Sequence, residues 1–220
     1  MASRSESTIG VLASGGLDSA ILVSYLLNQG ERVQPFYIES GLRWQAVELA
    51  KLLQYLTAVA KPELAELVVL ELPLQDLYGS HWSLTGDVPG AATADDAVYL
   101  PGRNLLLAIK PALWCQMHGI GQLALGVLAS NPFDDASEAF FRALENTLAR
   151  LGQPPLKIVR PFGAMHKRDV MEIGRNYPLG LSFSCISPVG TLHCGRCNKC
   201  AERQAAFKMA GMDDPTAYAK

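Results

Sequence analysis

The sequence lacks the long apolar runs that mark membrane proteins. Apolar stretches such as Leu67–Leu72 are far shorter than the roughly 20 residues that a membrane-spanning helix needs. The polar N-terminus, residues 1–6, does not show the order of positive charge and then apolar residues that is typical of a secretion signal. We therefore expect a cytoplasmic protein that is not attached to a membrane.

Neither sign of charge dominates the chain. It has 19 Lys and Arg against 21 Asp and Glu, a formal net charge of -2, so any polyanion site has to be local. Aromatic residues make up only 8% and are not interleaved with basic ones, so nucleic-acid binding is not expected. The 220 residues, 49% apolar and 18% charged, are typical of one globular domain with a small appendage.

Cysteines are few, and their distribution is uneven. Cys115 stands alone beside Leu113 and Trp114, where we expect a buried packing residue. The other four, which fall in one short stretch, are Cys185, Cys194, Cys197 and Cys200. In a reducing compartment such crowding favours metal ligation over disulfides. Four thiolates at short steps fit a closed, structural tetrahedral Zn²⁺ site, and a [4Fe–4S] cluster is the alternative.

Apolar runs alternate with helix-length amphipathic stretches, which predicts an α/β fold with a doubly wound, five-stranded parallel sheet. The predicted strands are Thr8–Ala13, Val33–Ile38, Leu67–Leu72, Gln122–Leu128 and Leu156–Val159. The predicted helices are 18–27, 42–60, 104–118 (kinked or interrupted at Pro111), 137–151, 167–175 and 197–209.

Two further features set the predicted organisation. The connection from Pro73 to Leu100 is much longer than is usual in α/β units, which favours a functional loop. We expect a nucleotide-binding α/β domain over residues 1–177 and a zinc-binding, helical tail over residues 178–220.

A Gly-rich turn follows the first predicted strand. This phosphate turn, Ala13–Ser19, has two adjacent glycines, which leave room for an anion at the amides that open the next helix. Gly10 and Gly15 have Walker A spacing, but Gly16 stands where that motif needs Lys, so an ordinary P-loop NTPase is disfavoured. The plain alternative is a tight turn in which Ser14 or Asp18 only caps the helix.

The residues from Ser14 to Ser19 resemble the Ser-Gly-Gly-x-Asp-Ser signature of the PP-loop ATP pyrophosphatases, which cleave ATP between its α and β phosphates. The resemblance implies that Ser14, Gly15, Gly16, Asp18 and Ser19 hold the departing pyrophosphate and its Mg²⁺. A substrate oxygen would then attack the α phosphate, helped chiefly by positioning and charge neutralisation.

Several other segments, in the same order along nearly the whole chain, resemble the 7-cyano-7-deazaguanine synthase (QueC) family. They are Tyr99–Asn104, Pro178–Cys185 and His193–Arg203. The resemblance implies adenylation of 7-carboxy-7-deazaguanine by ATP, attack by ammonia to give an amide, and a second adenylation that yields the nitrile.

The same resemblance supplies further candidate site residues. Arg103 and Lys167 would join Ser14, Asp18 and Ser19 as catalytic residues, through contacts to phosphate or the substrate carboxylate. Nucleotide binding would involve Ala13, Ser14, Gly15, Gly16, Leu17, Asp18, Ser19, Arg43, Arg103 and Asn104, and the purine-like substrate would meet Phe133 and Asp135.

Two segments depart from the family pattern. Ala136 and Ser137 replace a Cys-Arg pair, and in the segment 40–44 only Gly41 and Arg43 can be matched. One alternative is therefore a divergent ATP-dependent amide ligase that acts on a related acid or amine. Another is a zinc-ribbon protein that senses ATP without turning it over. The family also suggests a homodimer.

Overall fold

The computed structural model describes residues 8–93 and 95–219, so the polar N-terminal stretch lies outside the described residues. A single five-stranded sheet forms its centre, with the order β3-β2-β1-β4-β5 and all neighbours parallel. The strands are β1 (Thr8–Leu12), β2 (Arg32–Glu39), β3 (Val68–Glu71), β4 (Gln122–Ala124) and β5 (Lys157–Val159). This arrangement confirms the predicted α/β class.

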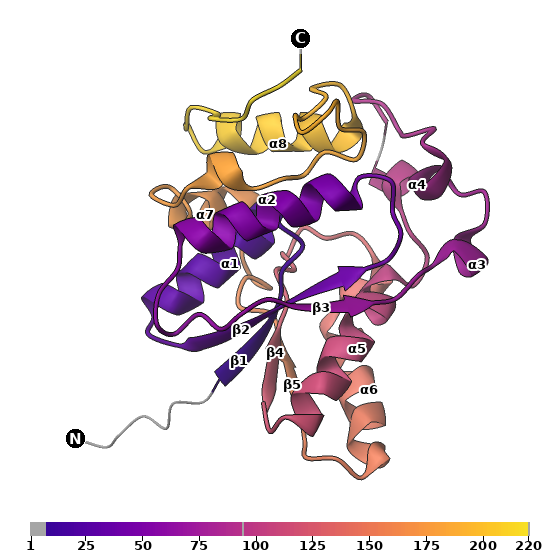
Figure 1. The fold of residues 1–220 in the computed structure, drawn as a ribbon, viewed down its shortest axis with the longest axis vertical. Helices are drawn as coiled ribbons and strands as arrows, with labels where there is room; N and C mark the ends of the chain where they lie inside the picture. The colour runs from indigo at the N-terminus through magenta and orange to yellow at the C-terminus, as the bar shows by residue number, and fades with distance from the viewer. Residues whose placement is uncertain (1–7, 94, 220) are drawn as a thin grey trace.

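Helices cover both faces of this sheet (Figure 1). One face packs against α1 (Leu17–Asn28), α2 (Gln45–Ala58), α7 (Lys167–Ile173) and α8 (Asn198–Met209). The other packs against α5 (Arg103–Met117) and α6 (Glu138–Leu148), followed by the 3₁₀ turn η3 (Ala149–Leu151). Each layer buries its own apolar cluster, as a doubly wound sheet requires. Cys115 is fully buried in the second cluster, as predicted.

The order of the strands places the site. β1 lies between β2 and β4. The connection after β1 leads toward one edge of the sheet, and the connection after β4 leads toward the other. At such a switch point the loops after adjacent strands part, which opens a crevice at their carboxyl ends. The phosphate turn follows β1 and therefore lies at this crevice.

β4 ends at Ala124, well before the predicted Leu128. A Cβ on Gly126 would lie 3.2 Å from the backbone carbon of Asp18 and the backbone nitrogen of Ser19. The chain after β4 therefore passes against the first turn of α1 and cannot continue to pair as a strand. The contact brings this segment beside the phosphate turn.

Two predicted helices differ in detail. α2 begins at Gln45, not Leu42, because the Gln45 Oε1 atom accepts hydrogen bonds from the backbone N–H groups of Ser40, Gly41 and Leu42 and so fixes a loop there. Of the predicted kink or interruption at Pro111, the interruption is wrong, since α5 runs from Arg103 to Met117. Fully buried residues next to Pro111, such as Ala112, hold α5 against the sheet and offset the lost hydrogen bond.

The long connection over residues 73–100 is real, but it contains single helical turns. These are α3 (Gln75–Tyr78), α4 (Trp82–Thr85) and η1 (Asp95–Val98). Two more 3₁₀ turns, η2 (Asp134–Ala136) and η4 (Leu179–Leu181), lie in later loops. In the part of the chain that is described, no helix is both long and apolar enough to cross a bilayer.

Candidate nucleotide and metal sites

A cavity of about 310 Å³ lies at the carboxyl ends of the central strands. Six segments of the chain contribute to its lining: the phosphate turn, the start of α2, the long connection with the start of α5, the loop after β4, the start of α7, and the tail. The residues from these segments include Ser14, Asp18, Trp82, Tyr99, Arg103, Val127, Phe133, Phe183 and Glu202. Most of the predicted site residues therefore meet in one place.

The phosphate turn lines this cavity and leads into the start of α1. Gly15 has φ +80°, and a Cβ on it would lie 3.3 Å from the Leu52 Cβ, so the bend favours glycine. Gly16 is the N-cap of α1 and has no side chain of its own to cap the helix, while the Ser14 hydroxyl accepts a long hydrogen bond from the Gly16 N–H at 3.5 Å. The Ser14 and Ser19 hydroxyl oxygens lie 3.2 Å apart. Backbone amides at a helix start, together with such hydroxyls, are suited to binding phosphate oxygens.

A chain of opposite charges lies beside the turn. Lys167 Nζ donates to both carboxylate oxygens of Asp18, at 2.8 and 2.7 Å, and lies 3.8 Å from Glu202 Oε1. Lys199 pairs with the same Glu202 at 2.7 Å. Burial raises the pKa of Glu202, but Lys199 and Lys167 outweigh it and hold the pKa below its usual value. A carboxylate and an ammonium group thus lie together beside the phosphate turn.

The start of α5 forms the opposite wall. Arg103 and Asn104 both line the cavity, and Asp135 accepts hydrogen bonds from the Asn104 backbone N–H at 3.1 Å and from its Nδ2 at 3.0 Å. Phe133 lies next to Tyr99, with ring centroids 4.9 Å apart. Asp135 thus fixes the loop that carries Phe133 against the start of α5.

The remaining predicted residues lie at or beyond the edge of the cavity. Leu17 lines it from the buried side, whereas Ala13 lines only a smaller neighbouring cavity. Arg43 lines neither: its Nη1 donates to the Thr85 carbonyl at 2.8 Å and packs over Gly86. In this structure Arg43 joins the loop before α2 to α4. Gly15 contributes through its backbone conformation.

Sequence reasoning missed Glu48 of α2. It lines the cavity and accepts a hydrogen bond from the Tyr37 hydroxyl at 2.7 Å. Burial raises the pKa of Glu48 to about 7, against hydrogen bonds from Tyr37 and Trp44 and the charge of Arg103, which lower it. The available signal was that Glu48 shares a helix face with Gln45 and Leu52, three residues before it and four after it.

The tail was predicted as an appendage for metal binding, but it also contributes part of the cavity wall. The Phe183 N–H donates to the Gly15 carbonyl at 2.7 Å, so the tail is bonded to the phosphate turn itself. Arg203, only 1% exposed, donates to the hydroxyls of Thr216, Ser182 and Ser184 and to the Leu179 carbonyl. These bonds hold α8 to the segment that reaches the turn.

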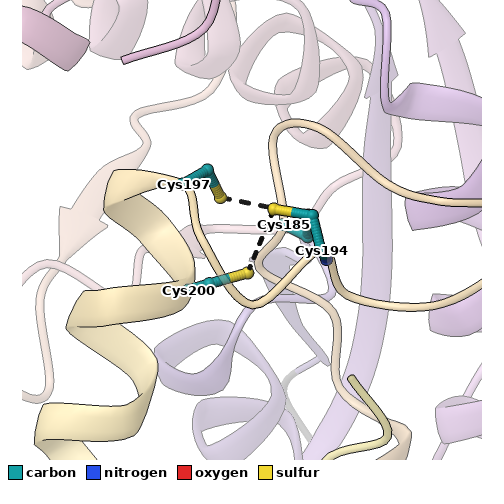
Figure 2. A group of neighbouring side chains, drawn as sticks. All are labelled: Cys185, Cys194, Cys197 and Cys200. Carbon is teal, nitrogen blue, oxygen red and sulfur yellow. Dashed lines mark hydrogen bonds between the residues drawn. The ribbon is translucent and has the colours of Figure 1, made fainter. Parts of the chain in front are cut away.

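The four predicted metal ligands converge. Figure 2 shows the side chains of Cys185 and Cys194 facing Cys197 and Cys200 at the start of α8. All four sulfur atoms lie within 4.8 Å of one another and are buried, with the closest pairs 3.9 Å apart. A tetrahedral site with metal–sulfur bonds near 2.3 Å needs sulfurs about 3.8 Å apart, so the cluster fits one ion. A four-iron cluster, which sets metal atoms between the thiolates, needs wider spacing.

Comparison with known proteins identifies the family. The sequence model described as "Queuosine biosynthesis protein QueC" matches residues 8–211. The chain belongs to the QueC family.

Curated QueC relatives are similar to this chain over nearly their full length. The "7-cyano-7-deazaguanine synthase" of Methanothermobacter thermautotrophicus is 30% identical, covering 94% of this chain and 97% of the relative. The "7-cyano-7-deazaguanine synthase 1" of Sphingopyxis alaskensis is 32% identical, covering 98% and 100%. QueC relatives are thus named as synthases, and the match includes both the phosphate turn and the cysteine-rich tail.

Solved structures outside the QueC family share the fold. A predicted subunit of tRNA methyltransferase from Methanocaldococcus jannaschii has a TM-score of 0.50 at 15% identity, covering 76% of this chain and 73% of that one. The U34-tRNA thiolase NcsA from Methanococcus maripaludis has the same TM-score of 0.50 at 12% identity, covering 94% and 68%. At such low identity the likeness concerns architecture alone.

Proposed function

We propose that this QueC-family chain is a 7-cyano-7-deazaguanine synthase, which uses ATP and ammonia to convert 7-carboxy-7-deazaguanine into the nitrile through adenylated acid and amide intermediates. The observation that carries the proposal is that relatives with that name match nearly the whole chain, and the cavity beside the phosphate turn supports it. The residues of the turn match the Ser-Gly-Gly-x-Asp-Ser signature of the PP-loop ATP pyrophosphatases.

The arrangement of charges supports adenylation at this site. Amides at the start of α1, with Ser14 and Ser19, would hold the pyrophosphate that leaves, while Lys167 would move from Asp18 to a phosphate oxygen. Arg103 on the opposite wall would bind the substrate carboxylate or the α phosphate with its planar fork. Transfer of the carboxylate oxygen to AMP would make it a good leaving group.

Two cations belong to the proposal. Mg²⁺ would be held by Asp18, the acidic side chain of the turn itself, and would neutralise the phosphates. Zn²⁺ would be held by Cys185, Cys194, Cys197 and Cys200, because four converging sulfurs fit a single tetrahedral ion and leave no open position for chemistry. Its role would be to fold the tail. A homodimer and a cytoplasmic location stay predictions of the sequence.

Asp18→Ala tests the adenylation site. Without the carboxylate, Lys167 loses its partner and the Mg²⁺ its ligand, so AMP and pyrophosphate formation with 7-carboxy-7-deazaguanine should fall by about 10²-fold or more. Glu172→Gln on the exposed side of α7 is the matched carboxylate control and should leave the rate unchanged. Undiminished AMP formation by the Asp18 variant would refute the assignment.

Product mass separates the proposal from its alternatives. After incubation with 7-carboxy-7-deazaguanine, ATP and ammonia, the proposed enzyme yields the nitrile. An amide ligase stops at the amide, and an ATP sensor forms no product and releases no pyrophosphate. Finding only the amide, or an unchanged acid, would contradict the synthase assignment.

A further inference from the structure

A second, smaller cavity of about 20 Å³ lies beside the main one. The two share wall residues, which are Leu12, Ser14, Glu48, Arg103 and Leu107, so the small cavity adjoins the phosphate-turn end of the site. A single water-sized molecule occupies roughly 10–15 Å³ by this measure. The small cavity therefore has room for one small molecule and no more.

The wall of the small cavity includes polar side chains whose hydrogen-bonding capacity is not fully satisfied. Ser40 is only 2% exposed, lines the cavity, and its hydroxyl has no hydrogen-bond partner within the described part of the chain. Glu48 lines it too and is engaged by the Tyr37 hydroxyl through Oε2. Most of the remaining wall is apolar, contributed by side chains such as Ile38 and Leu42. A buried hydroxyl left unpaired is costly, so a small hydrogen-bonding guest is favoured here.

The charges around the space decide which guest fits. Glu48 offers a carboxylate, and Ser40 and Tyr37 offer hydroxyl oxygens, all of which accept hydrogen bonds from N–H groups. Arg103 stands at the boundary with the main cavity, on the side where the substrate carboxylate is proposed to bind. A molecule the size of water that carries several N–H donors matches this lining.

We propose that the small cavity is the ammonia site, and that Glu48 binds ammonium and removes one proton before attack. This inference rests on the proposed function, because it assigns the second substrate of that reaction. Glu48 would be a catalytic residue in direct contact with the nitrogen, and Ser40 would be a second hydrogen-bond partner for it.

The chemistry requires such a base. Ammonium has no lone pair, so it cannot attack a carbonyl carbon until a proton leaves. The Glu48 carboxylate takes that proton and becomes a carboxylic acid, and the nitrogen forms a C–N bond to the acyl carbon. The C–O bond to AMP then breaks, AMP departs with the electron pair, and the nitrogen gives a second proton to the phosphate of the departing AMP, which leaves the neutral amide. Because burial raises the pKa of Glu48 to about 7, proton transfer from ammonium is easier than to an ordinary carboxylate.

The test compares Glu48→Gln with wild-type protein in two assays. Glutamine keeps the shape and can still accept from Tyr37, but it cannot take a proton. The first assay is ATP–pyrophosphate exchange that depends on 7-carboxy-7-deazaguanine and contains no ammonia. The second is amide and nitrile formation at varied ammonium concentration, with hydroxylamine, a neutral nucleophile at pH 7, as the substitute amine.

We expect Glu48→Gln to lose about 100-fold in kcat/KM for ammonium, the size typical of a general base. It should retain most exchange activity and should still form the hydroxamate from hydroxylamine. Ser40→Ala should raise the KM for ammonium several-fold with little change in kcat. Glu172→Gln is the control that leaves every rate unchanged.

Three outcomes would overturn the inference. An unchanged dependence on ammonium in Glu48→Gln would show that the small cavity is not the ammonia site. An equal loss of exchange and of ammonium-dependent product would assign Glu48 to the nucleotide, Mg²⁺ or the acid. If wild-type protein shows no exchange with this acid, the proposed function itself fails, and the inference fails with it.

Discussion

Glu48 and Arg203 are both ionisable side chains that the fold encloses, and their surroundings differ. Arg203 donates to four oxygen atoms of the tail, so hydrogen bonds within the protein replace those that its guanidinium would make to water. Glu48 has a hydroxyl partner in Tyr37 and faces cavity space. Removal of this carboxylate from water disfavours its charged form by more than Tyr37, Trp44 and the charge of Arg103 favour it, which is why its pKa rises. Destabilised charges of this kind are common at functional sites.

The raised pKa of Glu48 makes a prediction about stability. The folded protein holds the Glu48 proton up to about pH 7, whereas the unfolded chain releases it near 4.5. Between these values the folded state binds more protons, so the free energy of unfolding falls as pH rises from 4.5 to 7. We expect Glu48→Gln to be more stable than wild type at pH 8 by about 1–3 kcal/mol, with the difference vanishing near pH 4.5.

Urea unfolding of both proteins across this pH range measures the effect. Glu172→Gln provides the comparison for an exposed carboxylate, and it should not show a stabilisation that grows with pH. A pH-independent difference between Glu48→Gln and wild type would mean that Glu48 is charged in the folded protein at pH 5.

At the scale of the element, the strand–turn–helix unit at β1 and α1 was predictable because its signals are local. An apolar run, two glycines and an amphipathic helix follow one another within residues 8–28. The end of β4 and the start of α2 were not predictable in this way. They depend on the contact of Gly126 with Asp18 and on the hydrogen bonds of the Gln45 side chain, which the spacing of apolar residues does not encode.

The same reasoning explains which site residues were found. The phosphate turn and the four cysteines are recognisable by spacing, because each set lies in one short stretch. Glu48 was missed because a glutamate in an amphipathic helix is usually exposed. The tail's contribution to the cavity was missed because its bond from Phe183 to Gly15 joins residues far apart in the sequence.

Contact between elements can be tested at Gly10 of β1. A Cβ there would lie 2.7 Å from the Cys115 Sγ of α5 and 3.0 Å from the Phe36 ring, so β1 and α5 approach as closely as they do only because this residue is glycine. We expect Gly10→Ala to destabilise the protein by about 1–3 kcal/mol through overpacking. Cys115→Ala removes the nearest atom and should recover part of that loss.

A double-mutant cycle, measured by thermal or urea unfolding, tests whether Gly10 and Cys115 limit each other's packing. Cys115→Ala alone leaves a small cavity, so each single variant should be destabilised, and the pair should cost less than the sum of the two. Strict additivity of the two changes would show that Gly10 and Cys115 do not limit each other's packing.

At the scale of the whole molecule, the tail and the sheet domain share one core and one cavity. Ala206 and Phe207 of α8, both at most 2% exposed, pack in the same apolar cluster as α1 and α7. The segment around Cys185 also places Phe183 and Ser184 in the cavity wall. The cluster of four cysteines therefore begins in the same stretch of chain that reaches the phosphate turn, so folding of the tail and completion of the cavity are coupled.

This coupling predicts the effect of removing the metal. Structural zinc contributes on the order of 10 kcal/mol where it has been measured in small domains, comparable to the whole stability of an ordinary domain. Loss of the ion should release α8, expose Phe207 and withdraw the Phe183 N–H from Gly15. We therefore expect metal-free protein to melt at a lower temperature and to lose ATP–pyrophosphate exchange, although none of the four cysteines contacts the proposed nucleotide site.

The experiment removes the metal with a chelator, dialyses the chelator away, and restores Mg²⁺ before measuring melting and exchange. Zn²⁺ added back should recover both in parallel, and Cys197→Ser should behave like the metal-free protein. Cys115→Ala, which leaves the four ligands in place, is the control for loss of a buried thiol and should keep its metal and its exchange activity. Full exchange in metal-free protein would show that the tail can unfold without opening the cavity, because the wall formed by Phe183 and Ser184 would then be dispensable for adenylation.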